Sequence, residues 1–195
     1  MKLQNNFKSI SSRIIHKQAI VSYLIKNGSV SRKHLANELK LTGASITNII
    51  NDLMESDIVY ELGMSNDAEK KVGRKEILID INENYKYAMG FDVSNNKIML
   101  TLINLKTKII EYKTWEYELL TQELIDEAIA CAQELIEQYS FERILGVGLL
   151  IRGFIEGELA LSLPIKNIKS QLREKLGLEV FMMNNAKGLA VCEMF

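Results

Sequence analysis

Two short amphipathic segments separated by a glycine-containing turn constrain this sequence more than any other feature. A helix is predicted over residues 31–40, because Ser31 is a residue type that caps helix N-termini and apolar residues follow at three- and four-residue spacing. A second helix is predicted over residues 44–56 on the same grounds, and Leu41-Thr42-Gly43 interrupts the two. Two short helices joined by a tight turn are typical of a helix-turn-helix.

The flanking residues complete a small domain around this motif. Apolar residues recur at helical spacing from Ile14 to Ile25, which predicts a helix that begins near Ser12 and ends at Asn27-Gly28. After the second short helix, alternating strands are predicted over 58–62 and 76–81, on either side of a polar loop. Three helices followed by a hairpin with a basic loop indicate a winged helix-turn-helix, mostly α with a β-hairpin wing, over residues 1–82.

From residue 83 the pattern changes to that of an α/β domain with a mixed sheet. Three consecutive strands are followed by helices that alternate with strands, and the apolar run 144–151 is typical of a strand covered on both faces. The predicted strands are 87–94, 97–104, 109–117, 144–151 and 179–183; the helices are 121–139, 167–176 and one from 185; a hairpin spans 153–157. The chain is therefore expected to be α/β overall, with domains at 1–82 and 83–195.

Charge is divided unequally between the two parts. The first 75 residues hold 12 Lys/Arg against 7 Asp/Glu, whereas the remainder holds 12 against 18. This division suits a DNA-binding module joined to an acidic domain, although ordinary scatter of surface charge is the alternative. The two cysteines and two histidines have no metal-ligand spacing, and no signal peptide or membrane-spanning run is found, so we expect no metal and a cytoplasmic protein.

The second short helix is the predicted recognition helix. Its N-terminal, outward residues are expected to face base edges, and the preceding turn to donate to phosphate. Asparagine can bind adenine bidentately, and the helix holds no Arg or Lys, so we expect an A·T-biased site. Arg74 in the wing either enters a narrow minor groove or contacts phosphate without preference. The predicted DNA-binding residues are Arg32, Thr42, Gly43, Ala44, Ser45, Thr47, Asn48, Asn51, Lys70, Lys71 and Arg74.

Four segments carry a resemblance to a known family. They are VGRKEILIDIN (72–82), YAMGFDVS (87–94), ILGVGLLIRG (144–153) and LEVFMMNNAKGLAVCE (178–193). With the helix-turn-helix before them, they resemble the ROK family of transcriptional repressors and sugar kinases, in its repressor branch. The resemblance implies that residues 83–195 form the N-terminal lobe of an actin-like, ribonuclease H-like ROK domain. It also leads us to expect a chain truncated within that domain, with the second lobe absent.

The resemblance also implies which kinase residues are changed. In the kinase members, a Gly-x-Asp-x-Gly-x-Thr loop holds phosphate; here Asp92 remains, but Ser94 and Asn96 stand at the positions of the second Gly and the Thr. The kinase Asn-Asp pair, whose Asp is the base, reads Asn184-Asn185, and an amide has no useful basicity near neutral pH. We expect no catalytic residue, no enzyme activity and no cofactor. Vestigial ligand-binding positions are predicted at Asp92, Gly153, Asn184 and Asn185.

Three functions remain to be separated. The first is a sequence-specific transcriptional regulator, a repressor of carbohydrate-related genes that binds a double-stranded DNA operator and whose effector would be a sugar or sugar phosphate. The second is a shortened ROK paralogue that acts by pairing with a full-length regulator, in place of a homodimer. The third is a sugar kinase relative, against which the altered phosphate loop and Asn185 both argue.

Overall fold

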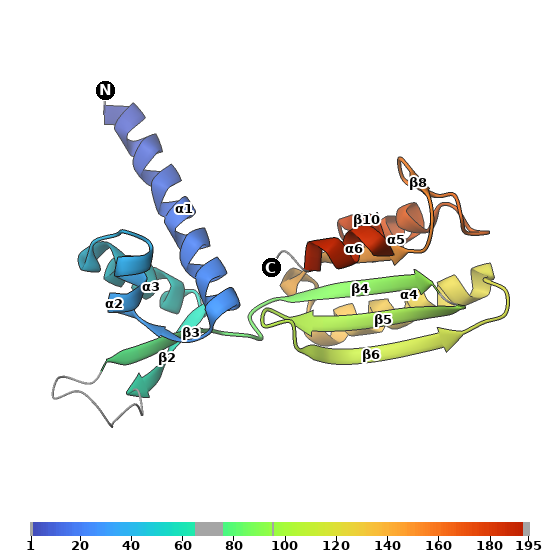
Figure 1. Cartoon of the computed structure of the whole chain (residues 1–195), viewed down its shortest axis with the longest axis horizontal. Coiled ribbons are helices and arrows are strands. Elements are labelled where there is room, and N and C mark those ends of the chain that lie inside the picture. The colour runs from blue at the N-terminus through green and yellow to red at the C-terminus, as the bar shows by residue number, and fades with distance from the viewer. Residues whose placement is uncertain (1, 65–75, 95, 193–195) are drawn as a thin grey trace. The chain divides into compact units, whose positions relative to one another are not determined.

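The computed structural model describes residues 2–64, 76–94 and 96–192, which divide into two compact units, Met1–Tyr85 and Lys86–Phe195. The first unit holds three helices and a small three-stranded sheet, whose first strand lies between the first two helices in the chain (Figure 1). The helices are α1 (Lys2–Asn27), α2 (Arg32–Glu38) and α3 (Gly43–Glu55); the strands are β1 (Val30–Ser31), β2 (Val59–Met64) and β3 (Ile77–Ile81).

Helix α1 is longer than its apolar pattern predicts. It begins at Lys2 rather than near Ser12, and Leu3, Phe7 and Ile10 continue the three- and four-residue apolar spacing toward the N-terminus, a signal that sequence reasoning missed. Ile20 and Leu24 are fully buried, whereas Ile14 and Ile15 are 52% and 58% exposed. Only the C-terminal part of the predicted apolar face therefore packs into the core.

The core of the first unit lies between the three helices and β3. Helix α3 buries the four residues that its spacing predicts, Ile46, Ile49, Ile50 and Leu53. The sheet has the order β1-β3-β2, all antiparallel, and the two-residue β1 is a strand that its sequence does not signal. A bulge between Glu61 and Gly63 interrupts the β2–β3 register just before the loop.

The second unit is built on a five-stranded mixed sheet of order β10-β7-β4-β5-β6. β4, β5 and β6 form an antiparallel meander, and β4, β7 and β10 are parallel. Its elements are β4 (Tyr87–Ser94), β5 (Lys97–Asn104), β6 (Ile109–Glu116), α4 (Gln122–Tyr139), the short 3-10 helix η1 (Phe141–Arg143), β7 (Ile144–Ile151), β8 (Ile155–Glu156), β9 (Leu159–Ala160), α5 (Ile168–Leu176), β10 (Val180–Asn184) and α6 (Asn185–Cys192).

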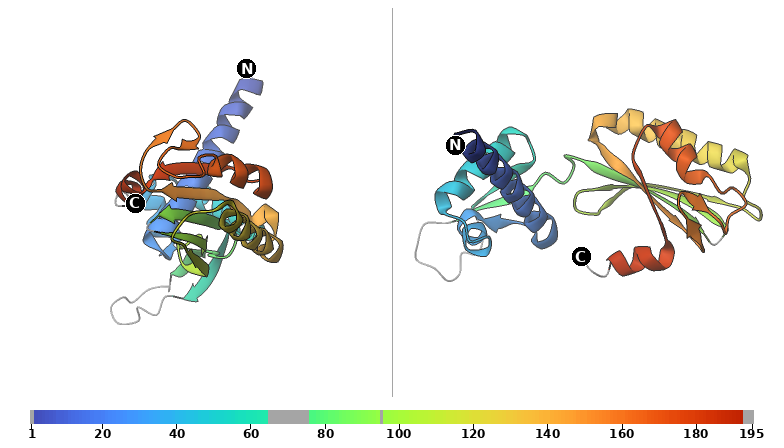
Figure 2. Two further views of the ribbon diagram at one scale, coloured as in Figure 1. Left: turned by 90° about the vertical axis from the view of Figure 1, so that its right-hand side faces the viewer. Right: turned by 90° about the horizontal axis from the view of Figure 1, so that it is seen from above.

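Helices cover the two faces of this sheet unequally. Figure 2 shows α4 and α5 on one face and α6 on the other. Strand β7 follows this division: Leu149 is fully buried, and Leu150, on the opposite face, is half-buried and lies close to Gly188 of α6. The expectation that β7 is covered on both faces is wrong at Leu145, which is 60% exposed, because an apolar run does not reveal how far a covering helix extends.

Candidate nucleic-acid interface

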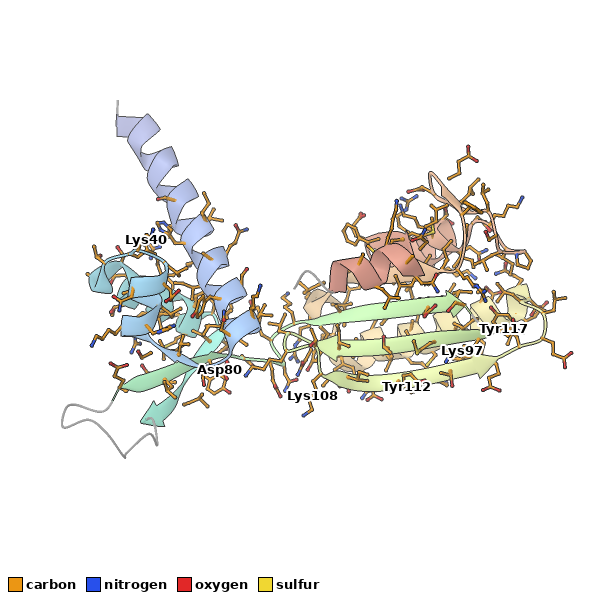
Figure 3. All side chains as sticks on the ribbon, in the orientation of Figure 1. Lys40, Asp80, Lys97, Lys108, Tyr112 and Tyr117 are labelled. Atoms are coloured by element: carbon orange, nitrogen blue, oxygen red, sulfur yellow. The ribbon has the colours of Figure 1, made fainter. Side chains whose placement is uncertain are left out.

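The turn between α2 and α3 is fixed by backbone hydrogen bonds to the end of α2. At the end of α2, Leu41 N–H donates to the Ala36 carbonyl (3.0 Å) and Lys40 N–H to Asn37 (3.3 Å), which is the Schellman arrangement. Lys40 occupies the left-handed position at φ 54°, where glycine is the usual residue (Figure 3). This turn sets the direction in which α3 leaves α2.

Helix α3 begins with a side-chain cap that uses two of the predicted DNA-binding residues. Thr42 Oγ1 accepts from Ser45 N–H (3.2 Å), and the Thr42 hydroxyl donates to Ser45 Oγ (3.1 Å). Thr47 Oγ1 donates to the Gly43 carbonyl one turn back (2.9 Å). These three hydroxyls organise the first turn of the helix, whose backbone N–H groups are suited to an anionic partner.

The exposed face of α3 presents two amides that remain available. Asn48 and Asn51 are exposed, and among the described residues neither side chain has a hydrogen-bond partner. Gly43 and Ala44 are exposed at the start of the same helix. The N-terminal part of the face opposite the buried isoleucines is thus polar, with two amides free to form hydrogen bonds, and the carboxylates of α3, Asp52 and Glu55, follow in its C-terminal half.

Arg32, the first residue of α2, is already engaged. Its Nη1 donates to Glu61 Oε1 of β2 (2.7 Å), Nη2 contacts Met54 Sδ of α3 (3.8 Å), and its buried Nε has no hydrogen-bond partner among the residues that the structure describes. The guanidinium therefore ties together α2, α3 and the first strand of the hairpin. The other predicted basic contacts, Lys70, Lys71 and Arg74, lie outside the described residues.

Helix α1 adds charge next to α3 that sequence reasoning missed. Arg13 and Lys17 both bind Asp52, which lies one turn after Asn48 on α3. The hydrogen bonds from Lys17 and then Arg13 hold the pKa of Asp52 below its usual range. The pairing joins residues 39 and 35 positions apart, so local spacing gives no signal of it.

In the second unit, the predicted ligand positions lie at one edge of the sheet. β4, β7 and β10 are parallel, and the register pairs Val93 with Ile151 and Ile151 with Asn184, so their carboxyl ends coincide. Asp92 lies two residues before the end of β4, Gly153 follows β7, and Asn184-Asn185 join β10 to α6.

Side chains at this edge are bonded within the unit. Asp92 Oδ1 accepts from the Ser94 hydroxyl (2.5 Å), and Asn184 Oδ1 accepts from Lys187 N–H (2.9 Å), as a helix cap does. Gly153 has φ 109°, and a Cβ there would lie 2.1 Å from Ser162 Oγ. Burial, and to a smaller extent the negative charge of Asp92, raises the pKa of Tyr117, which lines a groove together with Lys97 (Figure 3).

No group of three or more His, Cys, Asp or Glu side chains in the described parts of the chain could hold a metal ion. Across the same described residues, no helix combines the length and apolar character needed to cross a membrane.

Comparison with known proteins identifies relatives of both units. Residues 15–60 match the winged helix-turn-helix DNA-binding family. The chain is similar to a xylose repressor of Staphylococcus xylosus, with 26% identity over 83% of this chain and 43% of the relative. It is also similar to a xylose repressor of Bacillus subtilis strain 168 (23% identity, 92% and 48% covered) and to the DNA-binding transcriptional dual regulator NagC of Escherichia coli K12 (19%, 93% and 46%). The chain spans a little under half the length of these relatives.

A solved structure shows the same fold. The crystal structure of a ROK family transcriptional regulator, a homologue of the Escherichia coli Mlc protein, matches with a TM-score of 0.57 and 19% identity over 88% of this chain and 45% of that one. The expected fold class, a winged helix-turn-helix followed by an α/β unit with a mixed sheet, is confirmed.

Proposed function

We propose that this chain, a member of the ROK family with a winged helix-turn-helix DNA-binding domain, is a sequence-specific transcriptional regulator that represses carbohydrate-related genes and has no kinase activity. The observation that carries the proposal is the exposed face of α3. Its two free amides, Asn48 and Asn51, lie on a helix whose buried side and N-terminal turn are fixed by the rest of the domain.

The chemistry of this face favours A·T base pairs. An asparagine amide donates to adenine N7 and accepts from adenine N6, and the Ala44 methyl can pack on the thymine methyl. Guanine is read most often by Arg or Lys, and α3 contains neither. Affinity would then depend on phosphate contacts from the α3 N-terminus and from Lys70, Lys71 and Arg74 in the wing.

Carbohydrate control is proposed from the relatives. Several proteins that match over most of this chain are named xylose repressors. Asp92, Gly153, Asn184 and Asn185 remain the predicted positions for a sugar or sugar phosphate effector. Asp92 Oδ1 and Asn184 Oδ1 each accept one internal hydrogen bond, which leaves Asp92 Oδ2 and the Asn184 NH2 group to bind such a ligand.

The absence of kinase activity is proposed from two positions. Asn185 stands where the kinase members of the family have their base, and an amide cannot accept a proton near neutral pH. The Ser94 side chain, which donates to Asp92 Oδ1, stands where the phosphate loop of the kinases has a glycine, and so fills space that the loop leaves open for the nucleotide. A coupled ATP-turnover assay with hexoses and xylose is expected to give no rate above a protein-free blank.

Selection from random double-stranded DNA tests the main proposal. The purified chain is expected to enrich an A·T-biased site. If it neutralises about four to six phosphates per monomer, the logarithm of the association constant should fall with log salt at a slope of about −4 to −5. Failure to enrich any sequence, or a slope near zero, would contradict the proposal. Gel filtration with and without the selected DNA separates a homodimer from a monomer that needs a full-length ROK partner.

A further inference from the structure

A groove of about 440 Å³ runs between α1 and α3. Ser12, Arg13 and His16 of α1 line one side, and polar residues of α3, including Asn48 and Asn51, line the other. Two of the residues proposed to read DNA therefore share a groove with Arg13, a cation on a helix outside the helix-turn-helix motif.

Two cations, Arg13 and Lys17, pair with one carboxylate, Asp52, at this groove. Asp52 is the carboxylate of α3 on this side, and an unpaired carboxylate next to Asn48 would repel DNA phosphates. Arg13 binds it bidentately, with Nη2–Oδ1 at 2.8 Å and Nε–Oδ2 at 3.0 Å, and Lys17 Nζ lies 2.9 Å from Oδ2. Two cations on one carboxylate leave a net positive charge on the wall of the groove.

The orientation of Arg13 suits a second partner. Its bonds to Asp52 use Nε and Nη2, so the N–H groups of Nη1 remain available to donate to another acceptor. The Arg13 side chain is 57% exposed. A guanidinium held in one plane loses less conformational entropy when it binds a phosphate than a free lysine does. An exposed ion pair contributes little to folding stability. Stability alone is therefore a weak explanation for this arrangement.

We propose that Arg13 is a DNA phosphate contact beside the recognition helix, and that Arg13 and Lys17 together more than neutralise the Asp52 carboxylate between them. This rests on the proposed DNA-binding function and extends the interface from α3 and the wing to α1. The ligand is the sugar-phosphate backbone that flanks the bases read by Asn48 and Asn51, so the contact adds affinity for any sequence.

The competing explanation is a clamp that only holds α1 against α3. The two differ in what Asp52 does. If Arg13 acts on DNA, Asp52→Asn removes a negative charge near the phosphates and retains binding. If the pair is only a clamp, Asp52→Asn and Arg13→Gln break the same contact and weaken binding equally.

The test measures fluorescence anisotropy of the selected operator and of a random duplex over a salt series, using the full chain. Arg13→Gln is expected to weaken both complexes about tenfold and to make the log–log salt slope shallower by about one. Arg13→Lys should restore the slope. Asp52→Asn should bind random DNA at least as tightly as the wild type. Lys26→Gln is the matched control, since it removes one charge from α1 roughly 20 Å further along the helix and should change neither quantity.

Circular dichroism at the assay temperature checks that each variant is folded. An unchanged slope for a folded Arg13→Gln, or an equal loss with Asp52→Asn, overturns the inference while leaving the proposed function intact. A wild-type chain that binds neither duplex refutes the proposed function instead. If Arg13→Gln unfolds, Arg13→Lys decides the question. A folded Arg13→Lys whose salt slope is shallower than that of the wild type also overturns the phosphate contact.

Discussion

Asparagine side chains in the two units are used in opposite ways. Asn48 and Asn51 lie on the exposed face of α3 with no hydrogen-bond partner in the described residues, whereas Asn184 caps the first turn of α6. Asp92 is likewise engaged by Ser94. Polar groups left without partners on a rigid element are available to a ligand, whereas groups satisfied within the fold contribute to stability. This comparison favours the first unit as the site of recognition.

The largest expected effect is a loss of stability on truncating a buried side chain that packs α3 against the rest of the first unit. Ile50 is fully buried on the inner face of the helix, so Ile50→Ala should destabilise the first unit by about 2–5 kcal/mol. Urea unfolding followed by circular dichroism, with operator binding measured in parallel, should show both losses. The control is Ile14→Ala on α1, which is expected to change stability by no more than about 0.5 kcal/mol because Ile14 is exposed. Full operator affinity in a destabilised Ile50→Ala would break the link between the α3 scaffold and recognition.

A pair of alanine substitutions separates the two uses of asparagine. Asn48→Ala should reduce discrimination at one base pair by about 1–3 kcal/mol and leave the melting temperature unchanged. Asn184→Ala should lower stability by about 1 kcal/mol through the lost cap and leave operator affinity unchanged. Binding titrations against single-base operator variants and thermal melts measure both. If the two variants showed the same phenotype, the distinction between the units would be lost.

The smallest expected effect concerns the turn before α3. Lys40→Gly relieves a left-handed conformation that costs a side chain roughly 1–2 kcal/mol, against about 0.5–1 kcal/mol of added backbone entropy. A net gain of about 0.5 kcal/mol in unfolding free energy is expected. Gly28, which ends α1 at φ 75°, provides the reverse case, and Gly28→Ala should be destabilising. A loss of stability in Lys40→Gly would mean that the lysine makes a contact worth more than its strain.

Much of the fold follows from local signals in the sequence. The limits of β4, β5 and β7 and the buried residues of α3 match the predicted ones because periodicity and turn residues act over a few positions. The two-residue strand β1 did not follow, since no apolar pattern marks it. The start of α1 was missed although Leu3, Phe7 and Ile10 carry helical spacing.

The sequence by itself determined the helix-turn-helix, the mixed sheet and the polar face of α3, since caps, turns and apolar spacing are properties of neighbouring residues. Only the tertiary structure decided which of these side chains are free. It places Arg32 against Glu61 and Met54, and Arg13 against Asp52. These partners are between 22 and 39 positions apart, and a hydrogen bond depends on distances in space that no local pattern specifies.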